Sequence, residues 1–364
     1  MTTHEPRSAA LDSARAVRPG EELDAAKLAA YLKTHLAGGF DGALAITQFP
    51  AGHSNLTYLL EGGGREFVLR RPPFGSKVKS AHDMGREVKI LGPLSAVYPK
   101  APKPLVYCDD DSVIGAPFYV MERIRGRILR RAAPKDVDFS PPVARALSEA
   151  LVDELAALHA IDWRAAGLGA LGKPEGYVER QVSGWTKRWH DAKTDDVPDV
   201  ERVAAWLAEH LPRESGAVLV HNDFKYDNVV LDPDDITRIV GVLDWEMSTI
   251  GDPLVDLGVV LGYWVEEGDD PRLLALPFGP TNAPGSLSRR EVAARYAAKT
   301  GRDTSGILYY FVFALFKTAV VLQQIYYRFR QGLTTDERFA MLGMAVALLG
   351  ENASRAIDRG VVGR

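Results

Sequence analysis

The stretch LVHNDFKYDNVVL, residues 219 to 231, places six polar side chains between two apolar flanks. The flanks, AVLVH at 217–221 and NVVL at 228–231, have the composition of short strands, and the centre has that of a turn. We therefore expect a hairpin that carries Asp223 and Asn228 on its loop. The next apolar run, RIVGVLDWE at 238–246, adds a further carboxylate, Asp244, at the end of a strand.

Asp223, Asn228 and Asp244 have a spacing that suits phosphate chemistry. Asn228 follows Asp223 by five residues and Asp244 follows it by 21, and strand pairing can bring all three together. Amide and carboxylate oxygens suit Mg²⁺, which takes few protein ligands and keeps water and substrate phosphates. Asp223 is then left to accept a proton from a hydroxyl group. The simpler interpretation is a polar β-turn, in which Asp227 is a turn residue only.

The rest of the chain divides into a strand-rich part and a helix-rich part. A helix is expected at 22–36. From residue 40 to 124, hydrophobic periodicity and turn residues predict a small, mostly antiparallel sheet with one inserted helix: strands at 43–49, 56–62 and 66–71, a helix near 80–94, and two more strands within 104–124. Further helices are expected near 143–162, 197–211, 253–265, 289–300, 304–330 and 334–357. We predict an α+β, bilobal chain with a disordered lead-in at 1–20, a first lobe at 21–124 and a second lobe at 125–364.

Composition excludes several classes of protein. A net charge of −4 over 364 residues points to neither nucleic acid nor an anionic membrane. One cysteine, Cys108, excludes an internal disulfide and a cysteine zinc site, and it favours a reducing compartment. The most apolar run, 307–316, is too short to span a bilayer, and the first residues lack the apolar core of a signal peptide. We expect a soluble cytoplasmic protein.

Two motifs resemble the aminoglycoside phosphotransferase family, the small-molecule branch of the protein-kinase-like fold. HNDFKYDN at 221–228 resembles its catalytic loop, and LDWEMSTIGDPLVDLG at 243–258 resembles its metal-binding segment. The resemblance covers about residues 40 to 330. It implies that ATP and Mg²⁺ are the cofactors, that Asp223 is the catalytic base, and that Asn228 and Asp244 are the Mg²⁺ ligands.

The same resemblance assigns supporting residues around the loop. His221 resembles the residue that braces the loop, and Asp256 resembles a buried carboxylate that anchors the loop backbone. Lys225, two residues beyond Asp223, is predicted to steady the transferring phosphate; the alternative is a surface lysine.

The first lobe is then expected to hold the nucleotide. PAGHSNLTY at 50–58 lies where a phosphate-covering loop belongs, and it offers Gly52, Ser54 and Asn55, without a full G-x-G-x-x-G pattern. Strand alternation puts Val68 and Arg70 on one face, where they match an adenine-capping residue and a phosphate-binding cation. The family's strand lysine is replaced by Arg70, which is not a simple substitute; a solvated strand arginine is the alternative.

Two further parts of the first lobe complete the predicted nucleotide site. Glu87, in MGREVKIL, is the expected helix partner of Arg70, unless it only lines a solvated helix face. The backbone from Glu122 to Ile124, at the end of the first lobe, is expected to hydrogen-bond adenine. The runs VLR at 68–70, SAH at 80–82 and RE at 86–87 resemble the kinase-like domains fused or related to acyl-CoA dehydrogenases.

We therefore predict a kinase that transfers the γ-phosphate of ATP to a hydroxyl of a small molecule. The branch resemblance favours a hydroxyacyl compound or its CoA thioester over an aminoglycoside. The alternative is an inactive pseudokinase that binds nucleotide. His159 is expected to be structural, and the acidic VEEGDD at 265–270 is expected to be solvated.

Overall fold

The structure is a computed structural model that describes residues 12–50, 55–74, 83–130, 136–276, 278–334 and 336–363. Its contacts group the chain into two units. The first comprises the residues up to 128 together with 164–168 and 228–247, and the second comprises 129–163, 169–227 and 248–364. Residues 228–247 thus pack with the first unit although they follow a long part of the second, and the sequence gives no sign of this.

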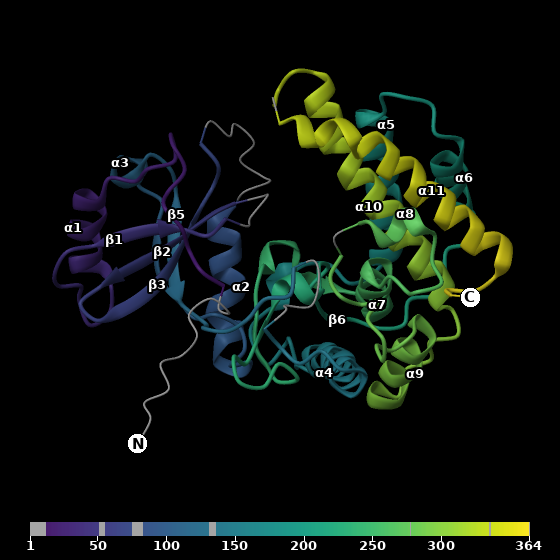
Figure 1. Ribbon diagram of the computed structural model, residues 1–364, viewed down its shortest axis with the longest axis horizontal. Helices are drawn as coiled ribbons and strands as arrows, with labels where there is room; N and C mark the ends of the chain where they lie inside the picture. Colours follow the sequence, from purple (N-terminus) through teal and green to yellow (C-terminus); the bar gives the residue numbers. More distant parts are fainter. Residues whose placement is uncertain are drawn as a thin grey trace. The chain divides into compact units, whose positions relative to one another are not determined.

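The first unit is built on a five-stranded antiparallel sheet of order β1-β2-β3-β5-β4 (Figure 1). Its strands are β1 (Ala45–Gln48), β2 (Leu56–Gly62), β3 (Arg65–Arg71), β4 (Pro104–Cys108) and β5 (Phe118–Glu122). Gly63 and Gly64 have positive φ in the tight turn between β2 and β3, a conformation that glycine adopts readily in a hairpin turn. The small antiparallel sheet expected in the first lobe is present.

Helices and one short ladder complete the first unit. Helix α1 (Ala25–His35) buries Leu28 and Leu32 in one core with the inner faces of β2, β3 and β5. Helix α2 (Met84–Val97) begins at Asp83, whose side chain accepts from the Arg86 N–H. The remaining elements are α3 (Asp111–Ile114), the β7 (Val229–Leu231) and β8 (Ile239–Val242) pair, and the 3₁₀ turn η4 (Trp245–Met247).

The lead-in predicted as disordered at 1–20 is only partly described. Residues 1–11 lie outside the described residues. Arg15 and Gln48 exchange both backbone hydrogen bonds at 2.8 Å, so the part near residue 15 is ordered against β1. Strand β1 is at the edge of the sheet, and an edge strand has N–H and C=O groups that can pair with another segment.

The second unit is mainly helical. Its helices are α4 (Pro141–His159), α5 (Tyr177–Ala192), α6 (Pro198–Glu209), α7 (Pro253–Tyr263), α8 (Pro271–Leu274), α9 (Arg289–Thr300), α10 (Ile307–Arg330) and α11 (Leu342–Arg359). Short 3₁₀ turns lie at Gly169–Leu171, Tyr226–Asn228 and Glu337–Met341. Helix α10 packs against α11, α7, α5 and α6 (Figure 1).

Helix α10 is the one helix in the described residues that is long and apolar enough to cross a membrane, and 72% of its most apolar window is buried within the fold. Such burial is typical of the central helix of a helical unit, because its apolar side chains pack against the neighbouring helices. The sequence predicts a buried helix here, and the burial agrees with that prediction.

The hairpin expected around residues 217–231 is not formed. Strand β6 (Val218–Val220) pairs with β9 (Thr249–Gly251), and β7 pairs with β8. The two flanks of the polar stretch therefore belong to different ladders and to different units. Short apolar runs fit several pairings equally well, since register is set by neighbours that local sequence does not reveal.

Candidate active site

Asp223 lies on the loop that follows β6, in the second unit. Lys225 Nζ lies 3.0 and 2.9 Å from its two carboxylate oxygens, and the Tyr263 hydroxyl donates to Oδ1 at 3.0 Å. Burial lowers the pKa of Lys225, but Tyr263 and Asp223 raise it by more, so the net shift is upward. The lysine is therefore a permanent cation, and the carboxylate is held in one orientation by two donors.

The backbone beneath Asp223 is anchored by Asp256 on α7. The Asp256 carboxylate accepts the N–H groups of His221 and Asn222 at 2.6 and 2.7 Å, and it lies 3.1 Å from His159 Nε2. Burial alone would raise the pKa of Asp256, but hydrogen bonds and positive charge from His159 and His221 hold it below the usual value. The anchoring contact predicted for Asp256 is present.

Asn222 takes a left-handed conformation, with φ of +64°. A non-glycine residue in this region is uncommon, and asparagine tolerates it better than most. Its side-chain oxygen accepts from the Tyr177 hydroxyl at 3.0 Å, and its carbonyl oxygen accepts from Lys317 Nζ at 2.7 Å. His221 braces the same loop, because its Nδ1 accepts the Asp223 N–H at 3.3 Å.

Asn228 and Asp244 lie in the first unit, at one end of the β7–β8 ladder. Val229 pairs with Val242, and the Leu243 N–H donates to the Asn228 carbonyl at 2.8 Å. The residues that flank this pair therefore meet at the same end of the two strands. Asp244 also has positive φ, +68°, and backbone strain of this kind concentrates at functional sites.

Arg70 links the sheet to this ladder. Its guanidinium lies 2.8 Å from Glu87, 3.0 Å from Asp244 and 3.6 Å from Glu246. The predicted ion pair with Glu87 is therefore formed. Burial would lower the pKa of Arg70, but Glu87 and the other carboxylates raise it well above its ordinary value, so Arg70 is charged at every physiological pH.

Glu246 is held on two sides by the first unit. The Asn55 side-chain amide donates to its carboxylate at 2.7 Å, and Arg86 donates to its backbone carbonyl. Of the three candidate residues in the predicted phosphate-covering loop, Asn55 is described by the structure, whereas Gly52 and Ser54 lie outside the described residues. The segment predicted to bind metal is thus tied both to Asn55 and to α2.

The predicted adenine contacts lie on β3, at the end of β5 and just beyond it. Val68 is buried and pairs with Met121 across β3 and β5. The Glu122 N–H already donates to the Lys103 carbonyl at 2.9 Å, so an adenine contact at this residue would use its carbonyl oxygen. The Ile124 side chain fills the space that a side chain at Gly241 would need.

The side-chain oxygens of Asn228 and Asp244 fit a magnesium ion better than a transition metal. In the described part of the chain no group of three or more His, Cys, Asp and Glu residues is arranged to hold a metal ion. Mg²⁺ needs only one or two protein oxygens besides phosphate and water, and Asn228 with Asp244 supplies such a pair. Asp223 belongs to the second unit, so the convergence of all three residues stays a prediction.

The sequence interpretation missed three residues of these two groups. Tyr263 donates a hydrogen bond to the predicted base Asp223, and Lys317 donates one to the backbone of the adjacent residue. Glu246 forms an ion pair with Arg70 and accepts a hydrogen bond from Asn55. Helix α5, which supplies Tyr177, was not predicted. Its apolar residues recur at helical spacing, so the signal was present: Val178, Val182, Trp185, Trp189 and Ala192. Lys317 gives a signal as well, because it ends the apolar run 307–316 in the middle of a long helix.

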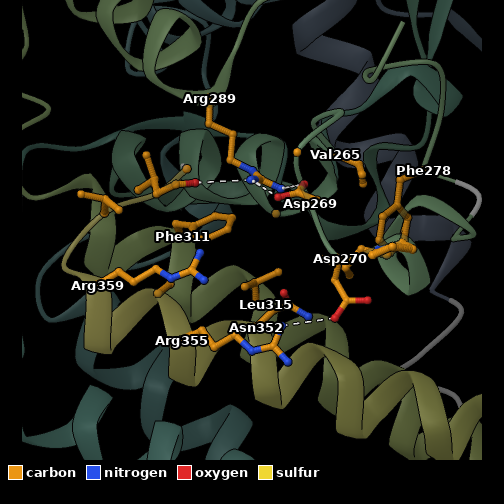
Figure 2. A pocket seen from close by; sticks show the side chains of 18 residues that line it. Val265, Asp269, Asp270, Phe278, Arg289, Phe311, Leu315, Asn352, Arg355 and Arg359 are labelled. Carbon is orange, nitrogen blue, oxygen red and sulfur yellow. Dashed lines mark hydrogen bonds and ion pairs between the residues drawn. The ribbon is translucent and has the colours of Figure 1, made fainter.

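A cavity of about 250 Å³ lies elsewhere in the second unit. Figure 2 shows Arg355 and Arg359 on one wall and Arg289 on another. Glu266 and Asp269 pair with the buried Arg289, and Asp270 pairs with Arg355. The acidic run at 265–270, expected to be solvated, is thus largely engaged in ion pairs. The lining of the cavity includes neither Asp223 nor Lys225. The candidate active site is therefore identified by the contacts of Asp223 and not by this cavity.

Comparison with known proteins decides the family. A sequence profile described as the phosphotransferase enzyme family matches residues 45–291, a range that includes both motifs and all the side chains described at the two groups except Lys317. The chain belongs to this family. Its members are small-molecule phosphotransferases, and the kinase-like fold described above is the one that the family resemblance implies.

Similar proteins place the chain within the family. Mouse acyl-CoA dehydrogenase family member 11 is 37% identical over 359 residues, which cover 94% of this chain and 44% of the relative. The chain therefore spans less than half the length of this relative. A Ralstonia eutropha protein assigned to the aminoglycoside phosphotransferases is 30% identical, with a TM-score of 0.77 over 93% of this chain and 99% of that one.

A more distant structure carries ligands. The aminoglycoside phosphotransferase APH(4)-Ia, solved with ADP and hygromycin B, is 17% identical. Its TM-score is 0.57 over 86% of this chain and 95% of that one. At this identity the likeness concerns the fold alone.

Proposed function

We propose that the protein transfers the γ-phosphate of ATP to a hydroxyl group of a small molecule. The observation that carries the proposal is the Asp223 carboxylate, which Lys225 and Tyr263 orient on an anchored loop. A carboxylate held in this way can accept the hydroxyl proton as the acceptor oxygen bonds to phosphorus and the bond to ADP breaks. Most of the rate enhancement in such transfers comes from alignment and charge neutralisation.

The other residues have roles in holding the nucleotide. Asn228 and Asp244 would hold Mg²⁺, which supplies positive charge against the phosphates when it is bound. Arg70, supported by Glu87, is proposed to orient the same phosphates, with the loop of Gly52, Ser54 and Asn55 above them. The family likeness to a protein solved with ADP supports an adenine nucleotide, for which Val68, Glu122 and Ile124 are the proposed contacts.

The charges near Asp223 favour an anionic or neutral acceptor. Lys225 bonds the carboxylate, and Lys317 is close enough for Asp223, Lys225 and Arg188 to influence its pKa. A polycationic aminoglycoside needs carboxylates on its binding surface. The acidic run at 265–270, which could have attracted one, has three of its carboxylates paired with arginines. We propose a hydroxyacyl compound or its CoA thioester, in keeping with the name of the similar acyl-CoA dehydrogenases.

The test is an ADP-release assay with hydroxyacyl-CoAs, free hydroxy acids, aminoglycosides, choline and sugars as acceptors. Asp223→Asn should lower kcat by about 100- to 10,000-fold, because the base is lost while the shape is kept. Asp227→Asn is the matched control: it makes the same change on the same loop, at a carboxylate that lies 3.7 Å from Arg130. Equal activity of Asp223→Asn and wild type would refute the assignment.

A nucleotide-binding protein without turnover is the second candidate. It is favoured by Arg70, whose guanidinium is already engaged by three carboxylates and is therefore less available to a phosphate. Thermal stabilisation by Mg·ATP, with no phosphate transferred to any acceptor in the panel, would support this candidate over the first.

A further inference from the structure

Lys317 lies in the middle of α10 and is buried among apolar residues. Its ammonium donates to the carbonyl of Asn222 at 2.7 Å and lies 5.7 Å from the centre of the Trp185 ring. Among the described residues no carboxylate lies within ion-pair distance of it. A buried ammonium without such a partner destabilises a fold, and methionine would fill the same space without that cost.

The charges that face Lys317 come from three directions. Asp223 and Lys225 lie on the loop, Asp256 lies on α7, and Arg188 lies on α5. Burial lowers the pKa of Lys317 to about 8, against the opposing influence of Asp223 and Asp256. The ammonium is thus retained at neutral pH at a cost to stability, and side chains of this kind concentrate at functional sites.

The group that Lys317 holds is the left-handed residue next to the predicted base. Three polar groups of Asn222 are each held by a different helix: its backbone N–H by Asp256 on α7, its side-chain oxygen by Tyr177 on α5, and its backbone carbonyl by Lys317 on α10. The peptide that joins Asn222 to Asp223 contains this carbonyl. Its orientation therefore sets the direction in which the Asp223 side chain leaves the backbone.

We propose that Lys317 is a positioning residue for phosphate transfer, which acts through the Asn222 carbonyl to fix the direction of Asp223. The inference rests on the proposed function of Asp223. Lys317 itself touches neither the acceptor nor the nucleotide. Its loss moves the base and leaves the nucleotide site of the first unit intact, so it lowers kcat and spares the KM for ATP.

The experiment compares Lys317→Met with Gln323→Met. Gln323 is a matched control because it is also buried on α10 and also donates to a backbone carbonyl, that of Ala192, at 2.8 Å. For each variant we would measure kcat, the KM for ATP, thermal stability, and hydrogen exchange of the amides of residues 219–228. Lys317→Arg, which keeps the charge and the donor, tests rescue.

Lys317→Met should lower kcat at least about tenfold, since small misplacements of a reacting group are costly. The KM for ATP should change by less than about twofold, because the residues proposed to bind ATP are not altered by the substitution. Exchange at 219–228 should accelerate, and Lys317→Arg should restore part of kcat. Gln323→Met should keep wild-type kcat and wild-type exchange in the loop.

Wild-type kcat together with wild-type loop exchange in Lys317→Met would overturn the proposal. An equal loss of kcat in Gln323→Met would also overturn it, because the effect would then be one of general stability. If the wild-type protein transfers phosphate to no acceptor, the proposed function fails separately. The exchange measurement then still decides whether Lys317 holds the loop, and unchanged exchange would overturn the inference.

Discussion

The buried ion pair between Arg70 and Glu87 gives the sharpest quantitative prediction. The side chains are 9% and 1% exposed, so neither is well hydrated in the folded state. Removing one partner deprives the other of its nearest buried counter-charge, at a cost of about 3–5 kcal/mol. Coulomb's law gives a similar figure, about 4 kcal/mol for charges 4 Å apart at an effective dielectric constant of 20.

The other partners of Arg70 contribute less to this loss. The side chains of Asp244 and Glu246 are 32% and 23% exposed. When the guanidinium is removed, water can therefore replace part of its electrostatic stabilisation of these two carboxylates. Arg70→Met and Glu87→Met should therefore each lower the free energy of unfolding by about 3–5 kcal/mol. The double variant should regain most of this, because two methionines fill the space without a buried charge.

Native-state hydrogen exchange of the β3 and α2 amides is the suitable assay, because the chain has two units and need not unfold in one step. Strictly additive losses in the double variant would refute the reasoning, since they would mean that the two charges do not depend on each other. The double variant also separates stability from function: its first unit should be stable while its affinity for Mg·ATP is reduced.

Two further predictions concern pH. Asp256→Asn should cost about 2–4 kcal/mol at pH 7, because two backbone N–H groups lose a charged acceptor. The folded-state pKa of Asp256 is depressed, so this stability is present above about pH 4 and is lost as the pH falls further. The gap between the urea denaturation curves of the two proteins should therefore narrow as the pH falls below about 4, and a constant gap would contradict the assignment. The pKa of Lys317 is depressed from 10.5 to about 8, so the unfolded chain holds this proton to higher pH than the folded chain. Wild-type stability should therefore rise relative to Lys317→Met between pH 8 and pH 10.5, by on the order of 3 kcal/mol. A difference between the two proteins that does not change with pH would exclude a buried ammonium.

The strands and helices of the first unit were predictable because their signals are local. The turn at Gly63 and Gly64 needs residues that tolerate positive φ, and the alternation in β3 places Val68 and Arg70 together. The ion pair of Arg70 with Glu87 was predictable from the family resemblance. These features depend on residues close in sequence or on a known motif.

The pairing of the short strands was not predictable in the same way. VLV at 218–220 and VVL at 229–231 have the same composition, yet one pairs with β9 and the other with β8. A three-residue apolar strand carries too little information to choose its partner. The choice depends on which surface each strand covers, and that is a property of the whole unit.

The amino-acid sequence alone was enough to predict the family and the proposed chemistry, through the order of Asp223, Asn228 and Asp244 and the carboxylate Asp256 in an apolar helix. Only the tertiary structure decided how the loop is held, with Lys317 and Tyr263 contributed by helices far along the chain. The reason is that reactive groups are recognised by type and spacing, whereas their orientation depends on buried contacts between distant residues, whose partners are chosen by packing and not by local sequence.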